Sequence, residues 1–138
     1  MNPKKLRVPC PTCSIEPKQF GHIYCSNKCQ WKHEHYRWVM KWFSGVEYIG
    51  EGTKHIKRYL IDTFGNKCSE CGWAEVNERT GHVPIQLDHI VDGNSKNNRP
   101  ENVRLLCPNC HSLTPTFGGL NRGNGRAWRR ERYLKVAA

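Results

Sequence analysis

The sequence predicts a small α+β protein whose fold is held together by cysteine clusters, and three observations support this class. Leucine, isoleucine, valine and phenylalanine make up only 27 of the 138 residues, so apolar burial alone favours folding weakly. Eight cysteines and seven histidines accompany this small apolar content, and metal binding can supply the free energy that a small core lacks. Apolar residues recur with helical spacing in two segments and lie in two short strand-like segments further on, which predicts both helices and strands.

The first cysteine group lies near the N-terminus and has the spacing C-x2-C-x11-C-x3-C. Two close pairs of thiolates are typical of a tetrahedral Zn²⁺ site. The expected ligands of this structural zinc are Cys10, Cys13, Cys25 and Cys29. Nearby histidines that could replace one cysteine are His22, His33 and His35.

A helix is expected next, with Ser26 as its N-cap and Phe43 near its end. One face of this helix carries Trp31, His35, Trp38, Val39 and Trp42. We interpret this face as a packing surface, with a base-stacking platform as the alternative. Three basic residues lie off that face and are candidate contacts for a polyanion: Lys32, Arg37 and Lys41.

The middle of the chain predicts a glycine-containing linker over residues 46–53 and a second helix over residues 53–64, with Gly65 as its stop. Strands are expected over residues 84–91 and 103–106, separated by a polar loop. A second zinc site is expected from two C-x2-C pairs, formed by Cys68, Cys71, Cys107 and Cys110. The 35 residues between the pairs leave room for both strands.

The net charge of +10 is concentrated in two flanks: +6 over residues 1–43 and +5 over residues 119–138, with −1 between them. Such basic flanks with interleaved aromatic residues favour nucleic acid as the partner, and a merely solubilising charge is the alternative. The arginines expected to contact DNA from the tail are Arg122, Arg126, Arg129 and Arg130.

Several classes of protein are excluded by the same sequence. No run of about 18 apolar residues predicts a membrane span, and the basic N-terminus lacks the apolar stretch of a secretory signal. We therefore expect a cytoplasmic protein whose cysteines bind metal rather than form disulfides. The size and the element pattern exclude a Rossmann sheet or a barrel enzyme.

Four polar residues stand in an order that suggests chemistry: Asp88, His89, Asn102 and His111, the last directly after Cys110. An imidazole is neutral and basic near pH 7, so His89 is a candidate general base. Asp88 and His111 could supply one oxygen and one nitrogen to a divalent cation. Because neighbours on a strand face opposite ways, Asp88 and His89 can converge only if the strand ends or bends there.

Over about residues 54–126 the sequence resembles the HNH (ββα-metal) endonucleases, in the segments D-H and E-N-V-R-L-L-C-P-N-C-H. It is most similar to the small, free-standing homing endonucleases of phage type with an N-terminal zinc finger. The resemblance implies a treble-clef-like ββα-metal core and a metal-dependent DNA endonuclease of homing or site-preferring type. It also implies that Asn102 ties down the loop that orients His89, and that a phage-encoded protein would act in the host cytoplasm.

Some relatives have a third metal ligand one turn after the last histidine, where this chain has Pro115. Protein ligation of the catalytic cation is therefore expected from two residues, and a carboxylate, water and phosphate site suits Mg²⁺ or Mn²⁺. The alternative functions are an inactive zinc-finger protein that binds nucleic acid and an RNA-associated zinc protein.

The expected organisation has four parts: a DNA-binding finger and helix (1–45), the linker (46–53), the nuclease core (54–118) and a basic tail (119–138). The expected partner is double-stranded DNA, with no membrane partner. We expect a monomer, which would dimerise on DNA only if both strands are cut together.

Overall fold

The computed structural model describes residues 7–46 and 52–121, and the chain divides into two compact units, Met1–Lys41 and Trp42–Ala138. The helices and strands follow the order α1, α2, β1, β2 and α3, with short 3-10 turns at Pro100–Asn102 and Gly118–Asn121. The expected linker lies largely outside the described residues, so the boundaries proposed from the sequence stay predictions.

The first unit consists of the N-terminal cysteine loops and most of α1 (Asn27–Phe43). Ser26 caps this helix as expected, because its Oγ accepts a hydrogen bond of 3.2 Å from the backbone N–H of Cys29. The aromatic face of α1 is not uniform: Trp31 is 37% exposed and stacks on His35, whereas Trp42 is 1% exposed. Only part of that face therefore behaves as a packing surface.

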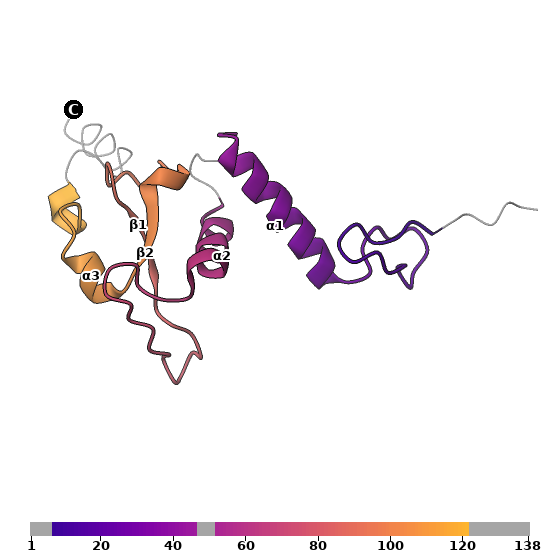
Figure 1. The fold of residues 1–138 in the computed structure, drawn as a ribbon, viewed down its shortest axis with the longest axis horizontal. Helices are drawn as coiled ribbons and strands as arrows, with labels where there is room; N and C mark the ends of the chain where they lie inside the picture. The colour runs from indigo at the N-terminus through magenta and orange to yellow at the C-terminus, as the bar shows by residue number, and fades with distance from the viewer. Residues whose placement is uncertain (1–6, 47–51, 122–138) are drawn as a thin grey trace, which may run out of the picture. The chain divides into compact units, whose positions relative to one another are not determined.

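The second unit is built on a two-stranded antiparallel sheet, β1 (Gln86–His89) and β2 (Val103–Leu106) (Figure 1). Its register pairs Asp88 with Arg104 and His89 with Val103. The first strand is shorter than the expected 84–91. Before it, Ile85 donates its backbone N–H to Val83 rather than to a partner strand, and after it a turn begins at Ile90.

Helix α2 (Thr53–Phe64) contacts β2 and buries Ile56 and Leu60 in the core. Each fully buried aliphatic side chain contributes about 1.5–3 kcal/mol of transfer free energy. The helix ends at Gly65, which adopts a φ of 91° and donates its N–H to the carbonyl of Ile61. Because this positive φ strains other residues, glycine is the suitable stop here.

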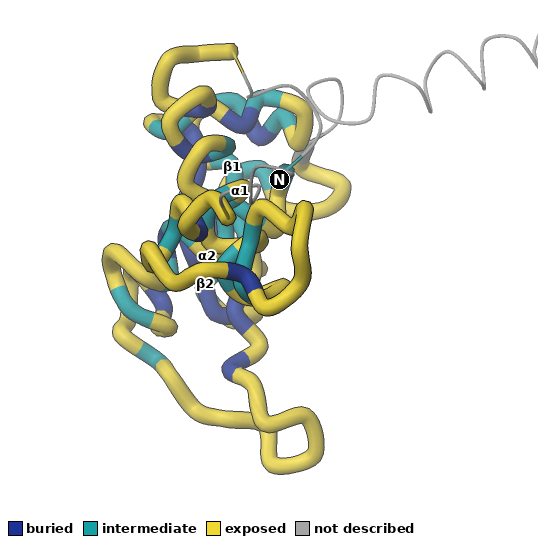
Figure 2. Tube along the Cα trace, turned by 90° about the vertical axis from the view of Figure 1, so that its right-hand side faces the viewer, coloured by how far each residue is buried: buried dark blue, intermediate teal, exposed yellow. Residues whose placement is uncertain are grey.

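Helix α3 (Pro108–Ser112) contacts both strands; Cys107 is its N-cap, and Cys110 of the same cysteine pair lies within it. Buried residues concentrate on the sheet and the elements beside it, whereas residues 74–82, which project from the sheet, are exposed (Figures 1 and 2). Among the described residues, none of the helices has both the length and the apolar character that a bilayer span requires.

Candidate active site and metal centres

The four cysteines of the second unit converge on one point, as expected for a structural zinc site. One ligand atom from each of them lies within 4.8 Å of every other; they are Cys68, Cys71, Cys107 and Cys110. The sulfurs of Cys71 and Cys107 are 3.8 Å apart, which matches the separation of about 3.8 Å across a tetrahedral site with Zn–S bonds of about 2.3 Å. This cluster could hold one zinc ion.

The electrostatics of this cluster also favour a cation. Burial opposes ionisation of Cys68, but backbone N–H groups of Cys71, Cys107 and Glu70 more than offset it and lower its pKa to about 6. The sulfurs of Cys71 and Cys107 raise the pKa of Cys110 to about 12. The thiol of Cys68 therefore ionises readily, whereas the raised pKa of Cys110 keeps its thiol protonated unless a bound cation stabilises the thiolate.

The backbone around the cluster joins it to the sheet. Ser69 donates its N–H to the carbonyl of Leu105 on β2 at 2.9 Å, and Cys107 Sγ accepts a hydrogen bond of 3.3 Å from the N–H of Cys110 at the start of α3. A metal ion held by these cysteines would therefore fix β2 relative to α3.

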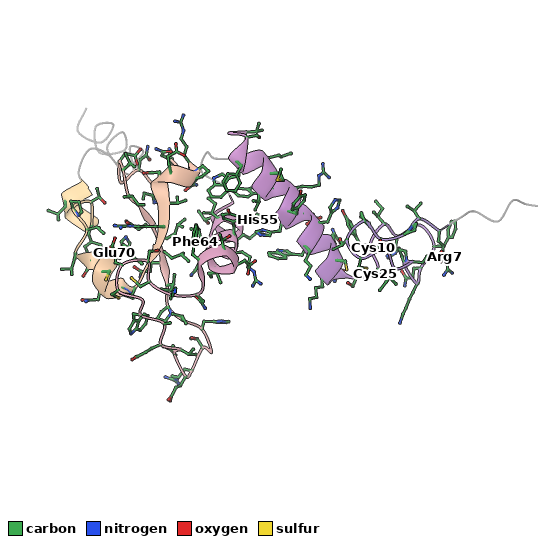
Figure 3. The ribbon with its side chains drawn as sticks, in the orientation of Figure 1. Arg7, Cys10, Cys25, His55, Phe64 and Glu70 are labelled. Carbon is green, nitrogen blue, oxygen red and sulfur yellow. The ribbon has the colours of Figure 1, made fainter. Side chains whose placement is uncertain are left out.

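The N-terminal cysteines form a second cluster of the same kind, with ligand atoms within 4.8 Å of one another. Cys10 and Cys25 face each other beside the start of α1 (Figure 3). The Cys13–Cys25 and Cys25–Cys29 sulfur separations are 3.4 and 3.5 Å, far longer than a disulfide bond of about 2.05 Å. Among the described residues, the ligand atoms that gather at this point come from the four cysteines and from no histidine, and His33 bonds Tyr24 through Nδ1 at 2.8 Å.

Asp88 and His111 meet beside the sheet, and this pair is the candidate site for a catalytic cation. Asp88 is 3% exposed, and its Oδ1 lies 3.6 Å from His111 Nε2. Two ligands at about 2.1 Å from one cation are between about 3.0 and 4.2 Å apart, depending on the angle. The geometry of the two residues therefore fits a shared divalent cation.

The other oxygen of Asp88 is already engaged. Its Oδ2 accepts a hydrogen bond of 2.9 Å from Arg104 Nε, and Arg104 Nη1 also binds Glu70, which Figure 3 labels. The three groups together carry a net charge of −1. Glu70 thus offsets the positive charge of Arg104, so that Asp88 Oδ1 can still attract a cation.

Gln86 orients the imidazole of His111. Its Oε1 lies 2.6 Å from His111 Nδ1, and because a carboxamide oxygen can only accept, the proton is on Nδ1. The lone pair of the neutral ring is therefore on Nε2, the atom that faces Asp88. This is the tautomer that a metal ligand requires at Nε2.

His89 is the last residue of β1, so the strand ends where the sequence analysis required it to end. Its Nε2 lies 2.8 Å from Asn98 Oδ1 in the following loop. Asn98 is fully buried, and its backbone carbonyl accepts a hydrogen bond from the indole of Trp42. Among the described residues, Asn98 is the one hydrogen-bond partner of the His89 ring.

Asn102 is the centre of the loop that follows His89. Its Oδ1 accepts from the N–H of Val91 at 2.7 Å, and its Nδ2 donates to the carbonyl of Asn97 at 2.7 Å and to Asp92 at 3.0 Å. Hydrogen bonds from Asn97 and then from the Asn94 N–H and Asn102 keep the pKa of Asp92 below its usual value. The buried amide of Asn102 therefore holds both ends of this loop.

Thr114 and Pro115 lie one turn after His111, where no third metal ligand is expected. Thr114 is buried and donates its Oγ1 hydrogen bond to the carbonyl of His111 at 2.9 Å. The side chain of Pro115 has no oxygen, nitrogen or sulfur atom to offer a metal, and ligation of the catalytic cation by two protein residues stays a prediction.

The segment that contains these side chains is similar to a known protein family. The model described as HNH endonuclease matches residues 68–114, a range that contains both C-x2-C pairs, β1, β2 and α3. Residues 68–114 are therefore similar to an HNH endonuclease domain. A phage relative, the H-N-H endonuclease F-TflIV of Escherichia phage T5, is 38% identical over 89 residues.

That alignment covers 60% of this chain but only 38% of the phage protein, so the chain spans less than half the length of its relative. No solved structure matches the chain significantly. The small α+β fold, with a cysteine cluster in the region that matches the HNH model, was expected from the sequence and is confirmed.

The structure describes the candidate DNA contacts on α1 but not those in the C-terminal tail. Lys32, Arg37 and Lys41 are exposed on α1. The tail arginines lie outside the described residues.

The region that matches the HNH endonuclease model also contains four polar residues with no role predicted from the sequence: Gln86, Arg104, Glu70 and Asn98. Gln86 could have been found from the strand pattern, since it lies two residues before Asp88 on the same face. Arg104 could have been found once the two strands were paired, since it lies opposite Asp88 in the register. Asn98 gave no such signal, because it is one of several asparagines in a polar loop.

Proposed function

We propose that the chain is a metal-dependent HNH-type endonuclease that hydrolyses phosphodiester bonds of double-stranded DNA. The observation that carries this proposal is the Asp88 Oδ1–His111 Nε2 separation of 3.6 Å inside the HNH endonuclease domain. A buried carboxylate and an imidazole nitrogen are thereby aimed at one point, while the adjacent His89 bonds Asn98 through Nε2 and no described residue bonds its Nδ1.

In the proposed mechanism, Asp88 and His111 would hold a divalent cation. The cation would supply Lewis-acid stabilisation of the scissile phosphate and of the leaving 3′-oxygen. His89 would accept a proton from the attacking water through Nδ1, since Nε2 is bonded to Asn98. Asn102 would keep the loop that carries Asn98 in place. The products would be a 5′-phosphate and a 3′-hydroxyl.

We propose Mg²⁺ or Mn²⁺ as the cation, because the chain offers few ligands and leaves the remaining positions to water and phosphate. Two zinc ions would hold the cysteine clusters. With one such site per chain, a monomer would nick one strand, and a double-strand cut would need a dimer on DNA or two successive encounters. Homing or another site preference is part of this proposal, as is action in the cytoplasm of a phage host.

The proposal is tested by nicking of supercoiled plasmid with Mg²⁺ or Mn²⁺, with and without EDTA. Wild type should nick, and His89→Ala should lose nicking while still binding duplex DNA in a gel-shift assay and retaining two zinc ions per chain. His82→Ala is the matched control, because His82 is exposed and belongs to the projecting loop. Binding without cleavage by wild type would favour the inactive zinc-finger protein instead.

We propose the basic tail and the basic residues of α1 as contacts to DNA phosphates. Deletion of residues 120–138 should weaken binding to unrelated duplexes about equally and reduce the slope of log affinity against log salt by about 0.9 for each phosphate that the shortened chain no longer neutralises. The measurement is a salt titration of binding by fluorescence anisotropy. An unchanged slope would exclude the tail from the phosphates, and tighter binding to folded RNA would favour the RNA-associated alternative.

A further inference from the structure

We propose that Asn98 is a positioning residue that fixes the tautomer of His89, so that the lone pair at Nδ1 is available to the attacking water. The inference rests on the proposed nuclease function, and it adds a residue to which neither the HNH pattern nor the comparisons give a role.

The contact between Asn98 Oδ1 and His89 Nε2 determines the tautomer of His89. Asn98 Oδ1 lies 2.8 Å from His89 Nε2. A carboxamide oxygen carries no proton, so His89 Nε2 must be the donor in this hydrogen bond. A neutral imidazole has only one N–H, so Nδ1 is then the basic atom. The opposite tautomer would leave a proton on Nδ1 and could not accept one from water.

Asn98 itself is held in place from two sides. The residue is 0% exposed, and the indole of Trp42, which is 1% exposed, donates to its backbone carbonyl. Asn102 fixes the preceding residue through the carbonyl of Asn97 at 2.7 Å. The amide of Asn98 therefore has a defined position before any substrate binds, as preorganised orientation of a base requires.

Packing alone does not explain an asparagine at this position. Among the described residues, Asn98 Nδ2 is a buried side-chain nitrogen without a hydrogen-bond partner. A buried donor left unpaired costs folding free energy, and an apolar side chain of similar volume would avoid that cost. The contact that makes use of the amide is the one between Oδ1 and His89.

The tautomer can be read directly by NMR in the zinc-loaded full chain. Long-range ¹H–¹⁵N correlation spectra at about pH 8.5, where an ordinary imidazole is neutral, should show His89 protonated at Nε2, with assignment from a His89→Gln spectrum. Asn98→Leu should give a mixture of tautomers, whereas Asn98→Asp, which still presents only acceptor oxygens, should keep the Nε2–H form. Asn66→Leu, at an exposed position, is the matched control and should leave the spectrum of His89 unchanged.

Activity is the second readout. In single-turnover cleavage with saturating Mg²⁺, Asn98→Leu should lower the rate at least about 10- to 100-fold with unchanged duplex affinity and zinc content, since that is the loss found when the hydrogen-bond partner of a metal-binding histidine is removed. Asn98→Asp should restore most of the rate at the same pH.

Two results would overturn the inference: an Nδ1–H tautomer in the wild type, or an Asn98→Leu variant that keeps both the wild-type tautomer and the wild-type rate. Loss of cleavage in Asn98→Asp together with an intact Nε2–H form would also overturn it, because the tautomer would then not be what limits the rate. Absence of cleavage by every variant, wild type included, would defeat the nuclease proposal, and the spectra would still decide whether Asn98 sets the tautomer.

Discussion

At the scale of single residues, the proposed cation site depends on His111 and also on Gln86, the hydrogen-bond partner of its Nδ1. Gln86→Leu removes the acceptor of the Nδ1–H, so His111 Nε2 should present its lone pair less often. We expect the concentration of Mn²⁺ needed for half-maximal nicking to rise about 10- to 100-fold. Because Gln86 is exposed, thermal stability should change little. Gln86→Glu keeps an acceptor oxygen and should stay near wild type; equal Mn²⁺ requirements in all three proteins would contradict the role of Gln86.

Arg104 neutralises part of the buried charge of Asp88, whose side chain is 4% exposed against 24% for Arg104. Arg104→Leu would leave that carboxylate without its charged partner, and we expect the free energy of unfolding to fall by about 1.5–3 kcal/mol, typical of hydrogen bonds to charged groups. Thermal denaturation of the zinc-loaded protein measures this decrease. Added Mn²⁺ should restore more stability to Arg104→Leu than to wild type, since a cation could replace the missing positive charge at Asp88.

Glu70→Gln is the control for that measurement, because Glu70 contacts the same arginine but is 54% exposed. Its effect on stability should be below about 1 kcal/mol, as for other exposed ion pairs. If Arg104→Leu were no less stable than Glu70→Gln, Asp88 would not depend on Arg104.

At the scale of elements, the loop between β1 and β2 is ordered by one carboxylate and one amide. Asp92 accepts from the side chain of Asn97 at 2.6 Å, from Asn102 at 3.0 Å and from the N–H of Asn94 at 2.9 Å. These bonds lower its folded-state pKa. Its charged form therefore stabilises the fold above the ordinary aspartate pKa of about 3.9, and this contribution is lost as the pH falls through the folded value.

We therefore expect Asp92→Ala to loosen this loop at pH 7, well above that range. Hydrogen exchange of the amides of residues 91–98 should accelerate, and the free energy of unfolding should fall by about 1–3 kcal/mol. Nicking should fall as well, because the loop carries the partner of His89. Asp62→Ala, which breaks only an exposed i,i+4 pair with Arg58, is the control. Unchanged exchange in Asp92→Ala would show that Asn102 alone orders the loop.

Elements with local signals could be predicted from the sequence, and contacts across the fold could not. The bounds of α2 and β2 follow from apolar spacing and from Gly65, and the cysteine clusters follow from C-x2-C spacing. The short β1 and the exposed Ile90 differ from the alternating pattern, because the chain turns toward the Asn102 side chain. The partnership of Asn98 with His89 and Trp42 joins residues up to 56 positions apart, and no local pattern encodes it.

At the scale of the whole molecule, each compact unit contains one cysteine cluster and few buried apolar residues. The described buried apolar residues number twelve, and three of these are cysteines of the clusters. A core of this size supplies little free energy on its own, whereas structural zinc contributes on the order of 10 kcal/mol in small domains. We therefore expect strong chelators to unfold the protein and two zinc ions per chain to restore it.

The two clusters should act separately, because they lie in different units. Cys68→Ser should lower the zinc content to one ion per chain, abolish the cooperative unfolding of the second unit and abolish nicking. Cys13→Ser should also retain one zinc ion, but it should keep the proposed nicking activity and reduce mainly duplex affinity. Zinc quantitation beside plasmid nicking at saturating protein separates the two variants. If Cys13→Ser abolished nicking even at saturation, the catalytic unit would depend on the N-terminal zinc, and its cysteine cluster could not be assigned to DNA binding alone.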